Sequence, residues 1–183
     1  MVGYIIGLVV ITLIIWFMVI TYNKLVRGRN KVRNAFAQIE THLQRRFDLI
    51  PNLVETVKGY QIHEKQLLEN VAACRSGYLR SSSPQEKVES YNDLNSSLRK
   101  LFAITESYPD LKANTNFIEL QTELQETEDK IAITRQFYND TVTSYNTLLQ
   151  LFPNVIFANM FGFHDEKLFK SSEEERKNVK VQF

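Results

Sequence analysis

Hydrophobic and polar positions divide the chain into one continuous apolar run and a long region of helical periodicity. Residues 1–23 carry no charged side chain, and Val2 to Thr21 are almost wholly apolar. About 20 helical residues span roughly 30 Å, the thickness of the hydrocarbon core of a bilayer. A cleaved secretory signal would need a basic start and a small-residue cleavage site, and this run has neither. The pattern therefore predicts a transmembrane anchor over residues 1–23.

Beyond the anchor, apolar residues recur every three or four positions, which is typical of one face of an amphipathic helix. They are Val32, Phe36, Ile39, Leu43, Phe47, Ile50, Val54 and Val57. Pro51 interrupts this stripe, so either the helix kinks there or a new helix begins. Because the stripe passes through Pro51 in phase, we expect one long helix, kinked at Pro51, that runs to about Arg75 and ends near Gly77.

Two further helix starts are marked by capping signals. Ser83 precedes Pro84 and stands three residues before Glu86, the spacing of a capping box. The apolar stripe that follows stops at Tyr108-Pro109. A third start is predicted at Asn116, with Glu119 as its reciprocal partner and a stripe of about 35 residues that ends before Pro153.

No stretch shows the alternation of a strand bounded by hairpin turns. The predicted fold is all-α: an N-terminal transmembrane helix followed by a long antiparallel bundle of three long helices plus a C-terminal helical segment. The expected domains are the anchor at 1–23, a bundle at 24–163 and a charged tail at 164–183. Within the tail, residues 165–180 are predicted to form a short solvated helix.

Charge is close to balanced overall but unevenly distributed. With 22 basic and 21 acidic side chains the net charge is +1, which argues against a protein that coats nucleic acid. Residues 24–46 nevertheless hold seven basic side chains and one acidic side chain. For a single-pass protein of a bacterial inner membrane, the positive-inside rule then predicts that the N-terminus lies outside and the C-terminal domain in the cytoplasm.

The residues nearest the anchor form a juxtamembrane basic cluster that is expected to attract anionic lipid headgroups, at about 1 kcal/mol per residue. The cluster consists of Lys24, Arg27, Arg29, Lys31 and Arg33. The alternative is that these side chains form a solvated helix face or pair with acidic helices. Residues 106–129 hold seven acidic side chains and one lysine. We therefore expect this acidic stretch, including Glu123 and Glu126, to pack beside the basic start of the first helix after the anchor.

The segment Phe152–Phe163, FPNVIFANMFGF, is rich in apolar side chains, which we expect to be buried against another surface. One interpretation is that it folds back and closes one end of the bundle. The other is that it forms a membrane-surface or partner-binding patch.

The sequence lacks the common motifs of metal-binding and nucleotide-binding sites. It contains no His-Glu-x-x-His, no Glu-x-x-His, no P-loop and no G-x-G-x-x-G. The lone Cys74 has no partner at a recognisable spacing, so an enzyme that uses Cys74 or His63 is a distant alternative. Gly28 lies between two arginines and suggests a flexible joint rather than a phosphate cradle. We expect no catalytic residues, no metal site and no cofactor.

Two motifs are specific enough to compare with known families: YNKLVRGRNKV at residues 22–32 and RRFDLIPNLVETVKGY at residues 45–60. They resemble the LemA family of bacterial membrane proteins. LKANTNF at 111–117, RQFYND at 135–140 and the final KVQF extend the resemblance over nearly the whole chain. The resemblance implies one N-terminal membrane helix and a cytoplasmic antiparallel bundle. It implies a scaffold or adaptor rather than a defined enzyme, with some members placed beside membrane proteases and one relative associated with magnetosome formation.

The polar residues of these motifs are the candidate partner surface. They are Arg45, Arg46, Asp48, Asn52, Glu55, Lys58, Arg135, Asn139 and Asp140. The alternative is that they satisfy one another inside the bundle.

The leading hypothesis is a membrane-anchored cytoplasmic helical scaffold or adaptor that binds lipid through its anchor. It would either assemble with itself as a homo-oligomer or bind a membrane-protein partner such as a membrane protease. The second hypothesis is a membrane-organising or curvature-shaping protein that binds anionic lipid through the basic cluster. Neither hypothesis involves nucleic acid.

Overall fold

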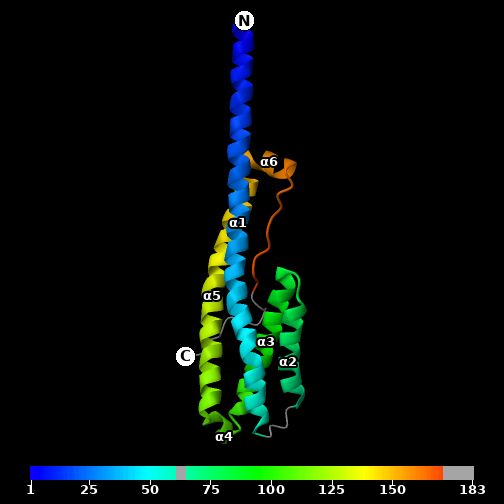
Figure 1. Ribbon diagram of the computed structural model, residues 1–183, viewed down its shortest axis with the longest axis vertical. Coiled ribbons are helices and arrows are strands. Elements are labelled where there is room, and N and C mark those ends of the chain that lie inside the picture. Colours follow the sequence, from blue (N-terminus) through cyan, green and yellow to red (C-terminus); the bar gives the residue numbers. More distant parts are fainter. Residues whose placement is uncertain (61–64, 171–183) are drawn as a thin grey trace, which may run out of the picture. The chain divides into compact units, whose positions relative to one another are not determined.

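The computed structural model describes residues 1–60 and 65–170, and all the regular structure there is helical (Figure 1). Helices α1 (Val2–Lys58), α2 (Lys65–Arg80), α3 (Pro84–Thr105) and α5 (Thr115–Gln150) are long, whereas α4 (Pro109–Lys112) and α6 (Asn154–Met160) are short. The predicted all-α class with an N-terminal apolar helix and a helical bundle is confirmed. The tail residues 171–183, with the final KVQF, lie outside the described residues.

Helix α1 is a single element of 57 residues that begins in the apolar run. It contains an 18-residue window with a mean hydropathy of 2.7, none of it buried, so by length and composition it can cross a membrane. The helix continues through Pro51, so no new helix begins at that proline.

The first helix ends earlier than its stripe predicts. After Lys58 the amide of Gly59 still donates to the carbonyl of Glu55, at 3.2 Å, but the amide of Tyr60 donates to the carbonyl of Val57, three residues back. Such three-residue bonds tighten and close a helix end. The predicted extension to Arg75 is therefore wrong, because α2 is a separate helix. Apolar residues recur every three or four positions both in one long helix and in two successive helices that each bury one face. This spacing alone therefore does not reveal the break.

Of the two later helix starts, that of α3 lies where the sequence predicts it and that of α5 does not. Ser83 and Glu86 form the predicted capping box at the start of α3. The start of α5 is displaced by two residues, since the Asn114 side chain accepts from the Phe117 amide at 2.9 Å. Asn114, and not Asn116, therefore occupies the capping position.

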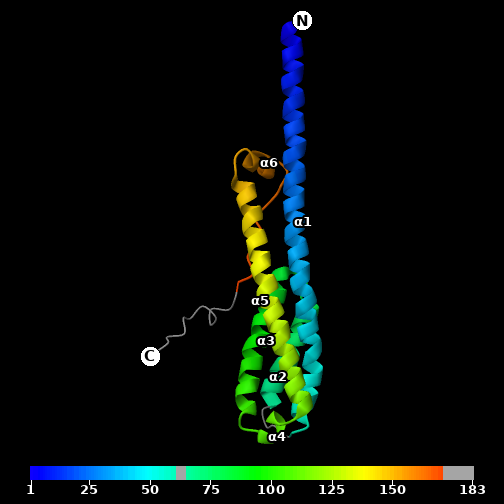
Figure 2. The ribbon, with the colours of Figure 1, turned by 90° about the vertical axis from the view of Figure 1, so that its left-hand side faces the viewer.

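The described chain divides into two compact units, Met1–Ala37 with Gln136–Leu168 and Gln38–Arg135 with residues 169–170. In the second unit, α2 and α3 run beside segments of α1 and α5, and α4 connects α3 to α5 at one end (Figures 1 and 2). The core of this unit is almost fully shielded from solvent. Its largest members are Phe47, Ile39, Leu43, Ile50, Leu53, Tyr91, Leu94, Leu98, Leu101, Leu111 and Phe117.

In the first unit, α5 runs alongside α1 and α6 lies beside α1 (Figures 1 and 2). The rings of Phe36 and Tyr138 meet edge to face with centroids 5.6 Å apart. Gly28 lies within α1, so the expected flexible joint is wrong, and the helix passes close to Tyr145 there. Residues 163–170 form no regular secondary structure. The helix predicted from residue 165 is therefore wrong over its described part, residues 165–170.

Candidate functional site

A buried arginine joins three helices of the second unit. Arg46 of α1 is only 5% exposed. Its guanidinium donates to the Leu124 carbonyl of α5 at 3.0 Å and to Asn95 Oδ1 of α3 at 2.8 Å. The same group lies 2.6 Å from Glu128 Oε2. A planar fork with several donors suits this role, because each arm reaches a different helix.

The surroundings of this arginine include a carboxylate and a tyrosine. The Tyr91 hydroxyl donates to Glu128 Oε1 at 2.6 Å, and the Tyr91 ring lies under the guanidinium, 5.9 Å from its centre. Burial lowers the pKa of Arg46 while the Glu128 carboxylate opposes that shift. Burial also raises the pKa of Tyr91, and Glu128 adds to it. We interpret Arg46 as an internal clamp, which is the alternative that the sequence left open for this residue.

One acid of the stretch 106–129 contacts a basic residue of α1, and it is neither Glu123 nor Glu126. Glu128 contacts Arg46, whereas Glu123 and Glu126 are exposed and Glu126 lies 3.8 Å from Lys130 of its own helix. The periodicity of α5 places Glu128 next to the buried Thr127 and Leu124. Composition identified the acidic stretch but could not identify which acid faces inward.

The other candidates on α1 are exposed. Asp48 accepts from Gln44 Nε2 at 3.0 and 3.1 Å and lies 4.0 Å from Arg75 of α2. Arg45 and Lys58 also face solvent. Asn52 and Glu55 line an open groove of about 440 Å³ between α1 and α5. Its other lining residues are Leu49, Thr56, Asn116, Glu119, Leu120 and Glu123. The structure thus brings together two predicted site residues and two glutamates, Glu119 and Glu123, that were not predicted as site residues.

The RQFYND motif is anchored by its tyrosine. The Tyr138 hydroxyl donates to the Lys167 carbonyl at 2.8 Å. Burial raises the pKa of Tyr138 to about 12. Arg135 and Asn139 are half-buried and engaged in contacts, while Asp140 is exposed.

Three polar contacts between distant residues were not predicted from the sequence. Asn146 of α5 brackets the Glu166 backbone, since its amide donates to the Glu166 carbonyl at 2.9 Å and its oxygen accepts from the Glu166 amide at 3.0 Å. Asn114 donates to the Tyr60 hydroxyl at 2.7 Å, so the motifs containing Tyr60 and Asn114 meet. Lys87 of α3 pairs with Glu40 of α1. No single-sequence signal specifies such pairings.

The basic cluster belongs to the first unit. Lys24, Arg27, Lys31 and Arg33 are exposed on α1, which leaves them accessible to anionic groups. Arg29 differs, because it is half-buried and its guanidinium lies 5.0 Å from the centre of the Phe163 ring.

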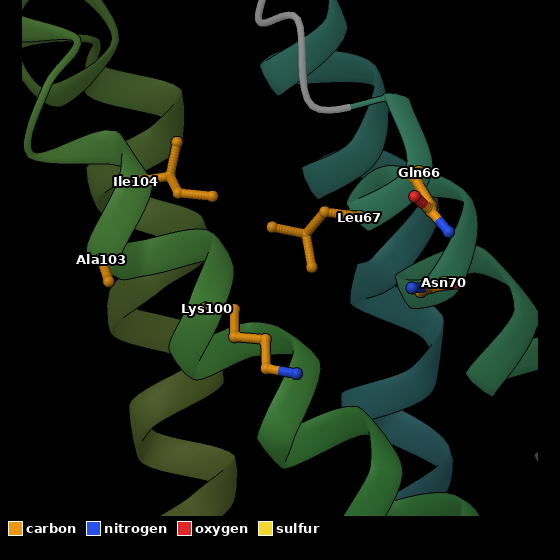
Figure 3. Close-up of a pocket in the computed structure, with 6 residues that line it drawn as sticks. All are labelled: Gln66, Leu67, Asn70, Lys100, Ala103 and Ile104. Atoms are coloured by element: carbon orange, nitrogen blue, oxygen red, sulfur yellow. The ribbon is translucent and has the colours of Figure 1, made fainter.

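A second open groove, of about 450 Å³, lies between α2 and α3. Leu67 and Ile104 point toward each other across it, and Lys100 and Asn70 lie at one end (Figure 3). The groove has no cluster of nucleophile, base and acid.

Among residues 1–60 and 65–170, no group of three or more His, Cys, Asp or Glu side chains could hold a metal. Cys74 is half-buried, and its sulfur lies 4.0 Å from Ser97 Oγ. Burial raises the pKa of the Cys74 thiol, which disfavours the nucleophilic thiolate. His63 lies outside the described residues.

These features define a helical protein in which one apolar helix can cross a membrane and a polar clamp holds a bundle together. The LemA family model matches residues 35–183, and the chain belongs to the LemA family. Protein LemA of Metamycoplasma hominis is 29% identical over 161 residues, which cover 86% of this chain and 72% of that protein.

Two magnetosome proteins, MamQ 1 and MamQ 2 of Paramagnetospirillum magneticum, are each 23% identical over 175 residues. The matches cover 81% of this chain and 64% of each relative, so the chain spans less than two thirds of these two proteins. The family and the apolar helix together indicate a membrane-associated protein. Neither the family's description nor the relatives' names specify an enzymatic reaction.

Proposed function

We propose that this protein is a membrane-anchored helical scaffold or adaptor whose bundle assembles with further copies or docks a membrane-protein partner. The observation that carries the proposal is that some motif residues of α1 are buried inside the bundle while others are exposed. Arg46 is used internally, whereas Asn52 and Glu55 are exposed along an open groove with Glu119 and Glu123. An open groove lined by carboxylates and amides suits a polar or basic segment of a partner protein better than a small substrate.

The anchor supports the same proposal. The apolar run and the groove-lining residues of α1 belong to one helix from Val2 to Lys58, with no linker between them. We propose that the N-terminus lies outside a bacterial inner membrane and the bundle lies in the cytoplasm, because the exposed basic residues follow the span.

The proposal is tested by photo-cross-linking in native membranes. A photoreactive amino acid replaces Asn52 in the groove, and a control replaces the exposed Glu89 on α3. The scaffold predicts a discrete cross-linked product at Asn52, either a copy of the chain or one reproducible partner, and none at Glu89. Absence of a product at both positions would contradict it.

A second function, the organisation of the membrane through anionic lipid, is favoured by the exposure of Lys24, Arg27 and Lys31. The full-length chain in mixed anionic and neutral nanodiscs should retain anionic lipid when analysed by native mass spectrometry. Substitution of these three residues by Gln should reduce retention. Matched substitution of Arg45, Lys58 and Lys100, which are also exposed, should not.

A further inference from the structure

Two uncharged stretches, far apart in sequence, meet in the first unit. Residues 1–23 carry no charged side chain, and neither do residues 141–163. The second stretch covers the end of α5, all of α6 and the residues up to Phe163. An uncharged stretch of this length is unusual in a protein with 23% charged residues.

Contacts between α1 and α5 fix the level at which these stretches meet. Tyr138 lies against Phe36, and Tyr145 lies against Gly28. Moving toward the start of α1 therefore corresponds to moving toward the end of α5. By this register Gln150, the last residue of α5, lies level with about residue 23 of α1, where the basic cluster gives way to the apolar run.

Helix α6 lies against the end of the apolar run. Phe157 contacts Phe17 with ring centroids 6.0 Å apart, and Phe161 contacts Tyr22 at 5.1 Å. The five residues from Phe17 to Tyr22 rise about 7.5 Å along the helix. Interfacial helices bury their apolar face about 5–10 Å into the boundary between headgroups and acyl chains. The level of α6 therefore matches that boundary.

The exposed side of this segment is mainly apolar, and Asn159 is an exposed polar side chain on it. Phe152 is 81% exposed, Met160 58% and Ile156 54%. Ile156 and Met160 are four residues apart and share one face of the helix. The polar Asn154 is buried instead, with its amide donating to the Leu148 carbonyl at 3.1 Å. A helix that faced water would expose mainly polar side chains.

The geometry points to the lipid bilayer as the occupant of this face. We propose that Leu151–Phe163 is a second membrane contact, lying in the headgroup and acyl boundary at the end of the span with Phe152, Ile156 and Met160 among the acyl chains. Continuity with the apolar run of α1 favours lipid over a second copy or a protein partner. This inference rests on the proposed membrane anchoring of α1.

The experiment uses the full-length chain in nanodiscs containing anionic and neutral lipid. Single cysteines on a Cys74→Ser background carry an environment-sensitive fluorophore at Ile156→Cys, at Phe137→Cys or at Val9→Cys. Phe137 is the matched control, since it belongs to the same unit and is also 54% exposed. It lies beside Tyr138, which packs on Phe36, about 20 Å along α1 from Tyr22. Val9 reports the span itself.

A nitroxide on the lipid near the headgroup should quench the Ile156 label strongly, and one near the acyl terminus should quench it less. Val9 should show the reverse order, and the Phe137 label should keep a water-like spectrum. If Val9 is quenched but Ile156 behaves like Phe137, the interfacial segment is refuted while the anchor stands. A blue-shifted Ile156 label that lipid cannot quench would mean a protein occupant and would also refute it. If Val9 is not quenched, both the anchor and the inference fail.

Discussion

Gly28 and Tyr145 lie at a close approach of α1 and α5. A Cβ atom built on Gly28 would stand 2.9 Å from Cδ2 of Tyr145, a distance that real Cβ atoms do not tolerate. The Tyr145 ring is buried, so it has little room to move. Gly28 therefore serves close packing within a continuous helix, although glycine is a poor helix former.

Gly28→Ala should destabilise the packing of α1 on α5. Overpacking of this kind costs about 1–3 kcal/mol, against a gain of up to about 1 kcal/mol in helix propensity. Hydrogen exchange of the α5 amides around Tyr145 in detergent should rise. Gly77→Ala is the control, because Gly77 lies within α2 and its added Cβ would meet Ser90 Oγ at an ordinary 3.5 Å. That variant should be neutral or slightly stabilising, and equal effects of both substitutions would contradict the account.

Arg46→Met should strongly destabilise the bundle. It would leave the Glu128 carboxylate and the Asn95 side chain without their partner, and breaking a buried pair costs about 3–5 kcal/mol. Thermal unfolding followed by circular dichroism should show the loss. Arg45→Met changes the neighbouring exposed arginine and should shift the unfolding free energy by no more than about 0.5 kcal/mol. If the two variants unfolded at the same temperature, Arg46 would not be an internal clamp.

Alkaline pH should weaken the fold through Tyr78. Burial, followed by the nearby Glu40 carboxylate, raises the pKa of Tyr78 to about 12, from an ordinary value of about 10. Between these values the unfolded chain holds fewer protons than the folded chain, so the free energy of unfolding falls as pH rises through this window, and Tyr78 contributes no change below it.

Tyr78→Phe removes this contribution and keeps the ring that stacks on Phe47 at 4.2 Å. Its unfolding free energy should therefore fall less steeply than that of the wild type across the same window, as measured by denaturant titration at each pH. The other buried tyrosines are unchanged between the two proteins, so their contributions cancel. Parallel slopes would show that Tyr78 ionises as freely in the folded chain as in the unfolded one.

Asn146→Ala should release the irregular segment around Glu166 from α5. Two hydrogen bonds to the Glu166 backbone depend on this one side chain. Exchange of the Glu166 amide should accelerate by about tenfold, equivalent to roughly 1.4 kcal/mol of local stability. Thr147→Ala, at the adjacent exposed position, should leave that amide protected. Unchanged protection in Asn146→Ala would mean that other contacts hold the segment.

The helix class, the apolar helix and the start of α3 could be predicted from the sequence because each depends on local pattern. The capping box at Ser83 and Glu86 is a three-residue signal, and the apolar run is a property of composition. The break after Lys58 could not be predicted in the same way, since the stripe of α2 continues the spacing of α1. Its signal is Gly59, where the helix closes.

The candidate site was predicted less well, because exposure is decided by tertiary packing. Arg45 and Arg46 are adjacent in sequence, yet one faces solvent and the other is 5% exposed. Periodicity could have separated them, because Arg46 directly precedes the buried Phe47 and lies three residues after the buried Leu43. The pairing of Arg46 with Asn95 and Glu128 has no such signal, since those partners come from two other helices.

The most direct test of the scaffold is the mass of the protein in its own membrane. Native nanodiscs, excised from cell membranes without detergent, would be analysed by native mass spectrometry. The account predicts a defined assembly, either a homo-oligomer or the chain with one reproducible membrane-protein partner, that is weakened by Asn52→Arg and Glu55→Arg in the groove. A monomer with bound lipid alone, unchanged by those substitutions, would contradict it.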